Sequence, residues 1–369
     1  MKVRIYILLI VFGLVACEEI YVPEIPEQPN SLVIEGLITD QEGGHFVNIS
    51  RSVRYNDTSL FEKVSGCTVF IQDKGGGLYL LREQDDGNYI TDKDVKGIVG
   101  HEYRVIVNLP DGNSYISSFE PILPVPPIDS VTGAYHEKTQ LVYREITGYS
   151  ELTYTGIQVA NSTLSAGFTP YYRYEYELVC QTAQIYPGYP LDILYYIARP
   201  VNSYSSSLIA ITDGNSYADK YVVNNPVSFV TTYMMEVKVD VDSMEYDEDG
   251  NRILSLEYIQ TVPLGIIVRL NQYSLNEDCY RFWEAVNNQM NATGQIFDPI
   301  ESQIMGNIIN RNDTTELVFG YFAASAVSKK SMFFYLEKGN QVITRPVKFF
   351  PELDSTIISN DLFDFWIIP

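Results

Sequence analysis

Short segments in which hydrophobic and polar residues alternate dominate the first third of the chain. They lie between residues 31 and 120 and are separated by stretches typical of turns, such as DKGGG at 73–77 and PDGN at 110–113. Alternation with a period of two places one face of a strand against a core, and regular turns favour antiparallel neighbours. The pattern predicts a β-sandwich of about seven strands. The expected strands are residues 32–38, 45–53, 67–73, 76–83, 87–91, 102–109 and 114–119.

Longer strand-like stretches rich in Tyr, Val and Ile fill most of the chain beyond residue 140. Such side chains fit a pleated, half-buried sheet. The closing stretch at 317–336 contains two apolar runs and predicts a strand hairpin. The other expected strands are residues 141–146, 153–160, 171–180, 191–198, 207–212, 227–241, 253–262 and 263–273.

One stretch has helical rather than strand spacing. Ser274 is a candidate N-cap, Glu277 follows three residues later as its capping-box partner, and Gly294 can end the helix. We predict an amphipathic helix at about residues 275–293, whose apolar stripe packs against the core rather than around a cofactor. The stripe consists of Cys279, Phe282, Trp283, Val286 and Met290.

A proline-rich segment separates the two strand-rich regions. Its prolines are Pro121, Pro124, Pro126 and Pro127. Proline cannot donate a backbone hydrogen bond inside a central strand, so this segment predicts a domain boundary. The expected fold class is mainly β: a sandwich at 31–120, a hinge at 121–129 that few contacts cross, and a larger β-rich domain with one helix at 130–369. The order of the first strands resembles the immunoglobulin-like or transthyretin-like sandwich of carboxypeptidase-regulatory domains.

The first residues have the pattern of an exported protein. A short basic start precedes an apolar run at residues 5–15, which is too short to span a bilayer. The sequence LVAC at 14–17 resembles a bacterial lipobox. It predicts a signal peptide over residues 1–16, an acyl anchor such as palmitate on Cys17, and an extended tether over residues 17–30. The alternative is an ordinary signal peptide with a chance cysteine.

The chain is strongly acidic, with a formal net charge of -22. Removal of the signal peptide takes away Lys2 and Arg4 and no acid, so the mature protein is more acidic still. Nucleic-acid binding needs basic patches that displace counterions, and this composition argues against it. Acidity at this level is typical of a soluble, exposed surface.

Three cysteines remain after Cys17. Cys67, Cys180 and Cys279 are an odd number and none lies in a CxxC spacing. They cannot all pair within one chain. The sequence leaves two states open, buried free thiols or a single disulfide, and favours the thiols.

The sequence predicts no catalytic site, no metal site and no cofactor. It contains three histidines and lacks a nucleophile elbow, a zinc motif, a P-loop and a dinucleotide fingerprint. The acidic stretch at 245–250 resembles the start of a calcium loop, but the twelfth position is Leu256, which offers no carboxylate. A hairpin turn explains the same residues. Paired carboxylates leave a hydrolase as an alternative.

Tyrosines concentrate around turn residues near position 190. They form a candidate binding loop, because tyrosine combines a flat apolar face with a hydroxyl at low entropic cost. Tyrosine that covers half-buried sheet is the more common case. The residues concerned are Tyr186, Tyr189, Tyr195, Tyr196 and Tyr204.

Three stretches in the last third carry a family resemblance. They are the helix SLNEDCYRFWEAV at 274–286, QIFDPIESQIMGNI at 295–308 and ELVFGYFAASAVSKKSMFFYL at 316–336. With VIEGLITD at 33–40 and PVPPIDSV at 124–131, they resemble a family of Bacteroidota outer-membrane lipoproteins catalogued as a domain of unknown function. Members of that family are often encoded beside TonB-dependent receptors.

The resemblance implies an outer-membrane protein that faces the cell surface or the periplasm. The first hypothesis is a non-enzymatic accessory lipoprotein that captures a ligand for, or scaffolds, a TonB-dependent transporter. The second is a structural or adhesive surface protein without a transport role, and the third is a surface hydrolase. The family has no catalytic residues to carry over.

The resemblance also implies a modification. Bacteroidota attach O-glycans to exported proteins at Asp followed by Ser or Thr and a small or aliphatic residue. Four positions match within expected loops, where a transferase can reach the hydroxyl. They are Ser130, Ser243, Thr314 and Ser355.

Overall fold

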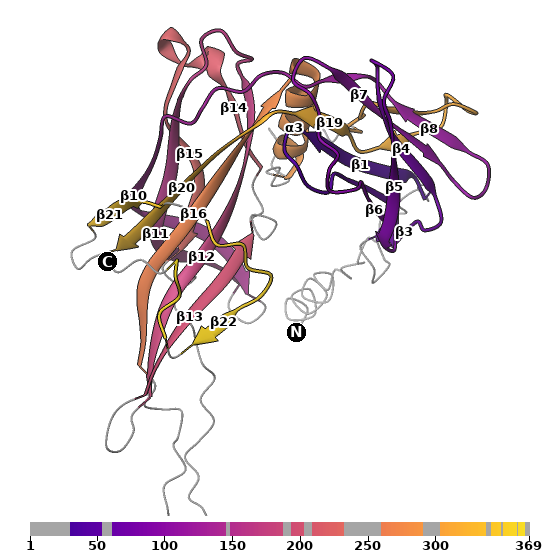
Figure 1. The fold of residues 1–369 in the computed structure, drawn as a ribbon. Helices are drawn as coiled ribbons and strands as arrows, with labels where there is room; N and C mark the ends of the chain where they lie inside the picture. Colours follow the sequence, from indigo (N-terminus) through magenta and orange to yellow (C-terminus); the bar gives the residue numbers. More distant parts are fainter. Residues whose placement is uncertain are drawn as a thin grey trace, which may run out of the picture.

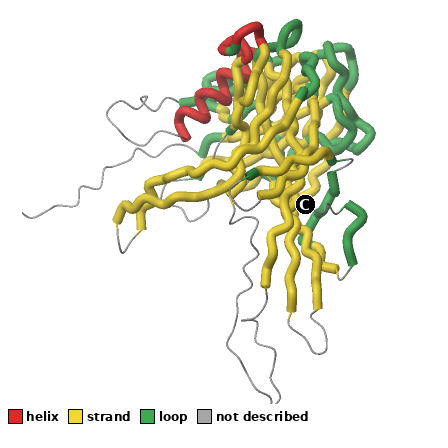
Figure 2. The backbone as a smooth tube through the Cα atoms, turned by 90° about the vertical axis from the view of Figure 1, so that its left-hand side faces the viewer, coloured by secondary structure: helices red, strands yellow, loops and turns green. Residues whose placement is uncertain are grey.

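The computed structural model describes residues 30–53, 61–144, 148–186, 193–202, 209–231, 260–290, 303–336, 341–347, 350–359 and 361–365. Within these residues the protein is mainly β with one α-helix, as the sequence pattern predicts. The strands form two β-rich bodies, and the helix lies where they meet (Figures 1 and 2).

The first body contains every strand that was predicted for residues 31–120. Alternate side chains of these strands are buried, which confirms the period-two pattern. Two short strands, β3 and β9, were not predicted. The elements are β1 (Leu32–Thr39), β2 (Phe46–Ser52), β3 (Phe61–Lys63), β4 (Thr68–Asp73), β5 (Leu78–Asp85), β6 (Asn88–Ile90), β7 (Glu102–Asn108), β8 (Ser114–Ser117) and β9 (Glu120–Pro121).

Strand β5 joins the two layers of this sandwich. Its first half, at 78–81, pairs with β4, whereas its second half, at 82–85, pairs with β6. Strands β4, β7 and β8 thus form one layer, and β6, β2 and β1 form the other. Side chains from both layers, including Ile34, Val69 and Tyr103, fill the core between them.

A distant segment completes this sandwich at both ends. Strand β17 (Ile308–Asn310) pairs with β8, while β18 (Val318–Phe319) and β19 (Phe322–Ser325) pair in parallel with β1. Phe322 is fully buried in the same core. The sequence analysis placed these residues with the C-terminal domain, yet their backbone partners and their burial lie in the first body. A fragment of residues 128–369 would keep these strands and lose their partners.

The second body is built from two sheets that face each other across a second core. Strands β10 (Ser130–Arg144), β11 (Gly148–Leu164) and β15 (Tyr221–Thr231) form one sheet. The other contains β12 (Tyr171–Tyr186), β13 (Ile193–Asn202), β14 (Ala210–Asp213), β16 (Gln260–Leu275), β20 (Val327–Leu336), β21 (Val342–Pro346) and β22 (Ile357–Ser359). Two short 3-10 helices, η2 (Gly214–Ser216) and η3 (Ala218–Lys220), precede β15.

Strand β12 shows how the sequence divides between core and surface. The tyrosines at 172, 174 and 176 point into the core, whereas Arg173, Glu175 and Glu177 lie on the opposite face. There Arg173 contacts Glu175 at 2.5 Å and Arg269 of β16 contacts Glu177 at 2.5 Å. The strand predicted for residues 171–180 is confirmed, and its side chains alternate between the two faces from Tyr172 to Leu178.

The hairpin predicted for residues 317–336 is wrong. Strand β19 pairs with β1 in the first body, and β20 begins two residues later and pairs with β16 in the second. Ala326 lies at this crossing, where its N–H donates to the Ser274 hydroxyl at 3.0 Å and its carbonyl accepts from the Ser274 N–H at 3.0 Å. Two strands that are continuous in the chain therefore connect the two bodies instead of pairing with each other.

The predicted helix is confirmed as α3 (Glu277–Met290), but its cap is not the predicted one. The Asn276 side chain accepts a hydrogen bond from the Cys279 N–H at 2.8 Å, which makes Asn276 the N-cap. Ser274 is still in β16, where its hydroxyl donates to the Leu123 carbonyl at 2.6 Å. Within the described residues, no helix is long and apolar enough to cross a membrane.

Most of the predicted apolar stripe of α3 packs as expected. Cys279 is buried in a small core with Leu275, Tyr321 and Ala323, and Phe282 and Trp283 pack against it. Met290 is wrong as a core residue, because 50% of its surface is exposed. It lies in the last turn, beyond the strands that α3 covers.

The proline-rich segment touches both cores. Ile122 is buried in the first core, Ile128 in the second, and Val125 packs against both. Polar side chains of the second body donate to its carbonyls: Gln272 to Pro126 at 3.1 Å and Thr163 to Pro127 at 2.6 Å. The expectation that few contacts cross this segment does not hold, and independent folding of the two bodies stays a prediction.

The stability of the first body should depend on pH through His45. This buried imidazole donates from Nε2 to the Val95 carbonyl at 3.0 Å, and its Nδ1 accepts from the Thr39 N–H at 3.3 Å. Burial lowers the pKa of His45 from its ordinary value of 6.5, while the Val95 carbonyl and the Asp40 carboxylate act in the opposite direction. Protonation would remove the acceptor that Thr39 uses.

Because the folded state holds the lower pKa, this contribution to stability is complete above pH 6.5 and is lost as the pH falls below that value. We expect the urea midpoint of the wild type to fall between pH 7 and pH 5 by more than that of His45→Gln. The exposed His136 offers a control, since His136→Gln should keep the wild-type pH profile. Parallel profiles for wild type and His45→Gln would contradict the prediction.

Candidate binding site

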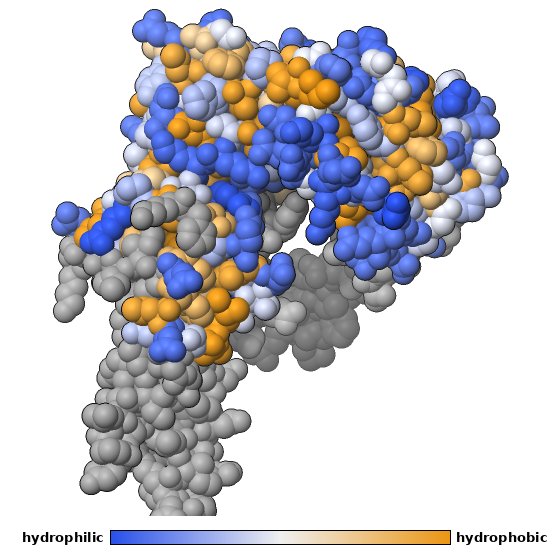
Figure 3. Space-filling model, viewed as in Figure 1, coloured by the Kyte–Doolittle hydropathy of each residue, from blue (hydrophilic) through white to orange (hydrophobic). Residues whose placement is uncertain are grey.

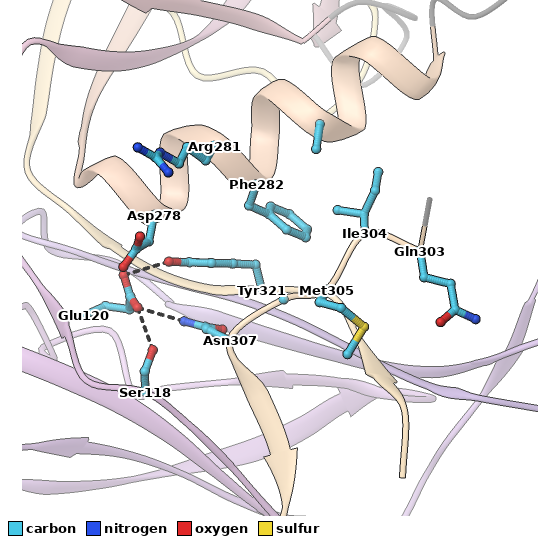
Figure 4. Close-up of a pocket in the computed structure, with 12 residues that line it drawn as sticks. Ser118, Glu120, Asp278, Arg281, Phe282, Gln303, Ile304, Met305, Asn307 and Tyr321 are labelled. Carbon is cyan, nitrogen blue, oxygen red and sulfur yellow. Dashed lines mark hydrogen bonds between the residues drawn. The ribbon is translucent and has the colours of Figure 1, made fainter. Parts of the chain in front are cut away.

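The main candidate site is a pocket of about 430 Å³ at the junction of the two bodies. Helix α3 forms one wall, residues 303–307 form the opposite wall, and Tyr321 and the end of β8 close the inner side (Figure 4). The lining residues are Ser118, Glu120, Asp278, Arg281, Phe282, Ala285, Gln303, Ile304, Met305, Gly306, Asn307 and Tyr321.

A buried carboxylate organises the inner end of this pocket. Glu120 is 4% exposed and accepts four hydrogen bonds from four separate parts of the chain. Its Oε1 accepts from the Ser118 hydroxyl at 2.8 Å and from the Asn307 amide at 2.9 Å. Its Oε2 accepts from the Asn276 amide at 2.6 Å and from the Tyr321 hydroxyl at 3.1 Å. All four donors are neutral, so hydrogen bonds rather than an ion pair hold this group in place.

Asn307 links this network to the sheet. Its side-chain oxygen accepts from the Phe322 N–H at 2.9 Å, and its amide also donates to the Phe322 carbonyl at 2.9 Å. The Asn307 side chain thus forms the two backbone hydrogen bonds with Phe322 that a neighbouring strand would otherwise form. The wall at 303–307 is therefore tied to the first body at the point where the sheet ends.

Two glycines allow this wall to approach. A Cβ on Gly306 would lie 1.5 Å from the Gly320 carbonyl oxygen, and a Cβ on Gly320 would lie 2.1 Å from the Ile34 carbonyl oxygen. Gly320 also has a φ of +92°, a conformation that side chains other than glycine rarely adopt. The close backbone contact therefore requires glycine at both positions.

Aromatic rings form the apolar part of the pocket. The rings of Phe282 and Tyr321 lie 4.9 Å apart between centroids. Burial raises the pKa of the Tyr321 hydroxyl, and the nearby Cys279 and Glu120 raise it further. Burial raises the pKa of the Cys279 thiol to about 12, so this cysteine is an inert core residue rather than a nucleophile.

The charged groups at the rim have different partners. Arg281 lines the pocket and forms an ion pair with Glu277, which lies one turn earlier on α3. Asp278 makes no hydrogen bond or ion pair with any described residue. Figure 4 shows Asp278 and Glu120 at the same end of the pocket, away from Ile304 and Met305. The Asp278 carboxylate is therefore available to a ligand.

A second, much smaller crevice lies on the other side of Tyr321 and Trp283. Arg173 lies over the Trp283 ring at 4.5 Å and contacts Glu175. Glu35 lines the crevice with part of its surface exposed; partial loss of solvent around its carboxyl raises its pKa, while Arg173 lowers it. Figure 3 shows hydrophilic side chains gathered along this middle region of the molecule. These contacts join α3 to β12 and leave little room for a ligand.

The residues that the sequence predicted as sites are only partly described. Cys17, Tyr189, Tyr204 and Ser243 lie outside the described residues. Tyr186 ends β12 and Tyr195 lies in β13, and the neighbouring Tyr196 is half-buried between β12 and β22. Tyr196, whose side chain is described, does not line the pocket. The binding loop stays a prediction, and the position of Tyr196 is that of a sheet residue.

The predicted glycosylation residues differ in accessibility. Thr314 is exposed in a turn in which Asp313 accepts from the Thr315 N–H at 2.9 Å. Ser355 is also exposed, whereas Ser130 is half-buried in β10 and pairs with Ser162 of β11. Modification stays a prediction, and Thr314 and Ser355 are the more accessible candidates.

The described residues contain one pair that resembles part of a catalytic triad. His101 Nδ1 lies 2.8 Å from the Asp73 carboxylate. Burial alone would raise the pKa of Asp73, but hydrogen bonds from His101 and the Gly75 N–H lower it. No hydroxyl or thiol in the described chain is hydrogen-bonded to His101, and no group of three His, Cys, Asp or Glu residues within it could hold a metal. The stretch at 245–250 lies outside the described residues.

The cysteines settle the open question about disulfides. Cys67, Cys180 and Cys279 form no disulfide within the described residues, and Cys180 and Cys279 are buried. The prediction of free thiols is confirmed, although Cys67 is only half-buried.

Most of the pocket residues lie in sequence motifs that by themselves predict no site. Asp278, Phe282, Asn307 and Tyr321 all occur in the three stretches that carry the family resemblance. Glu120 gave no signal, because a Glu at the end of an ordinary strand looks like a surface residue. A family model with the description "Domain of unknown function (DUF4249)" matches residues 18–331.

The chain belongs to the DUF4249 family. No curated protein sequence and no solved structure matches it. The described parts of the three stretches meet at one place in this family member: α3, residues 303–308 and the turn before β19 surround the pocket.

Proposed function

We propose that this DUF4249 protein is a lipid-anchored, non-enzymatic binding protein of the outer membrane that captures a ligand for a TonB-dependent transporter. The observation that carries the binding role is the pocket of about 430 Å³ around Glu120. Pockets of this size that combine apolar walls with a few fixed polar groups are typical small-ligand sites. The four hydrogen bonds on Glu120 hold the inner end of the pocket in a preformed shape.

The anchor rests on the sequence. The lipobox at 14–17 ends in Cys17, and the family match begins at the next residue, 18. This arrangement supports a mature protein that starts with the acylated cysteine. The transporter partnership rests on the resemblance to lipoproteins encoded beside TonB-dependent receptors. A structural or adhesive surface role is the rival proposal.

We predict that Cys17→Ala abolishes membrane anchoring. Cells grown with a clickable palmitate analogue should label the wild type and leave the variant unlabelled, because Cys17 is the residue that carries the acyl chain. The matched control is Cys67→Ala, which removes a different cysteine and should keep the label. Equal labelling of wild type and Cys17→Ala would contradict the lipoprotein assignment.

Co-purification tests the partnership. The tagged protein is isolated from native membranes in a mild detergent, and the accompanying proteins are identified by mass spectrometry. We expect a TonB-dependent receptor in stoichiometric amounts, and the same receptor should be absent when Cys17→Ala is purified. Isolation of the lipidated protein without any receptor would favour the structural or adhesive role.

A further inference from the structure

We propose that the pocket beside α3 binds the positively charged end of an organic amine or guanidine with an apolar body. The inference rests on the proposed function for the idea that this site captures a ligand, and it adds the chemical class of that ligand. Three observations carry it: the charges at the inner end of the pocket, the apolar opposite wall and the pocket volume.

The inner end of the pocket carries two carboxylates that form no ion pair within the described residues, and one cation, Arg281, lies at its rim. Glu120 is held by neutral donors, and Asp278 makes no ion pair with any described residue. The nearest basic side chain on the helix, Arg281, is engaged by Glu277. Two carboxylates that share one end of a partly enclosed site attract a cation and repel an anion.

The two carboxylates have different tasks. Both oxygens of Glu120 already accept two hydrogen bonds each, so Glu120 acts on a ligand through its charge. Asp278 retains its acceptor capacity and can receive hydrogen bonds from an ammonium or guanidinium group. The ligand's charged end therefore lies against Asp278, with Glu120 behind it.

The rest of the pocket suits an apolar body. Phe282 and Ala285 of α3 and Ile304 and Met305 of the opposite wall all line the cavity, and Figure 4 shows the Phe282 ring on the side of Ile304 and Met305. Met305 is 51% exposed, and its flexible thioether can adapt to the shape of a ligand. The volume of about 430 Å³ accommodates a single small amine or one basic side chain of a partner protein. The two sources share the same chemistry.

Calorimetric titration of the full lipidated chain in a nonionic detergent tests the proposal. The probes are phenethylamine, its neutral analogue 2-phenylethanol, and an acetylated hexapeptide with one central lysine. We expect phenethylamine to bind at least about tenfold more tightly than 2-phenylethanol, a difference of about 1.4 kcal/mol. Affinity for the amine should fall as salt is added, because salt screens the two carboxylates.

Asp278→Asn should weaken amine binding about tenfold while leaving 2-phenylethanol unchanged. The control Asp94→Asn removes the same charge from an exposed turn that does not line the pocket and should bind like the wild type. Ala285→Trp should block all probes by filling the cavity, and circular dichroism verifies that each variant is folded. Thermal unfolding of Asp278→Asn should stay close to that of the wild type, since Asp278 makes no hydrogen bond or ion pair with any described residue.

The outcomes separate cleanly. Asp278-dependent binding of the peptide assigns the site to a basic side chain of a partner protein, whereas binding of the free amine alone assigns it to a small molecule. Equal affinities for amine and alcohol, unchanged amine binding in Asp278→Asn, or no binding of any probe would overturn the inference. The receptor co-purification is independent of these titrations, so its failure would affect the proposed function instead.

Discussion

Replacement of Glu120 by alanine is expected to lower the free energy of unfolding by about 3 kcal/mol or more. The substitution removes the acceptor of Ser118, Asn276, Asn307 and Tyr321 and leaves their buried polar groups without a partner. The substitution also leaves an empty space at the inner end of the pocket, where the two bodies pack against each other. Urea unfolding, followed by tryptophan fluorescence, measures the change.

Two further variants define the cause. Glu120→Gln keeps the shape but turns one acceptor into a donor that faces other donors, so we expect a loss of about 1–2 kcal/mol. Glu102→Ala is the control, because Glu102 is an exposed partner of Lys74 and such pairs contribute at most about 1 kcal/mol. If Glu120→Ala cost no more than Glu102→Ala, the network would not be a source of stability.

Gly320→Ala is the second substitution for which we expect a large effect. A Cβ at this position meets the Ile34 carbonyl oxygen at 2.1 Å and the Ile34 carbonyl carbon at 2.8 Å, and these backbone atoms cannot rotate away as a side chain could. The variant must either separate β19 from β1 or displace the wall at 303–307. We expect a loss of more than about 4 kcal/mol, or failure to fold, measured by soluble yield and urea unfolding.

Gly112→Ala separates the clash from backbone strain. Gly112 has a φ of +95°, close to that of Gly320, but a Cβ there meets nothing within 4 Å. Gly112→Ala should lower the free energy of unfolding only through the strain of a positive φ at alanine, by about 1–2 kcal/mol. If Gly112→Ala and Gly320→Ala lowered the free energy of unfolding by similar amounts, the close contact between Gly320 and Ile34 of β1 would not contribute to stability. Gly306→Ala should resemble Gly320→Ala, because it meets the Gly320 carbonyl from the other side.

The local pattern of the sequence determined most individual elements. Strict alternation at residues 32–38 and 102–109 placed the strands of the first body correctly, because each strand has one buried face and turn residues at its ends. The helical spacing of Cys279, Phe282 and Trp283 likewise identified α3. These patterns are local, so each element can be identified without knowing which other segment it packs against.

The N-cap shows the limit of local signals. Ser274 followed by Glu277 has the form of a capping box, and Asn276 does not. Strand β16 continues to Leu275, because Ser274 bonds to Leu123 and Ala326 in the neighbouring chain segments. Tertiary hydrogen bonds thus moved the start of the helix by two residues.

Strand pairing was decided only by the tertiary structure. The apolar runs at 317–336 look like a hairpin, since neighbouring strands usually pair. The ends of the first sandwich, at β8 and β1, instead offer unpaired edges and a core that Phe322 fills. Closing these edges satisfies backbone groups that a local hairpin would leave exposed.

The candidate site also depends on this long-range pairing. Its residues are separated by up to two hundred positions in the chain, and Glu120 has the sequence context of an ordinary surface residue. Only the return of residues 303–325 to the first body brings Asn307 and Tyr321 to Glu120. The sequence by itself determined the acidic composition, the strands, the helix and the lipobox, because these are properties of neighbouring residues. The tertiary structure decided which edges close, which carboxylate is buried and where the pocket lies, because those outcomes depend on contacts between residues far apart in the chain.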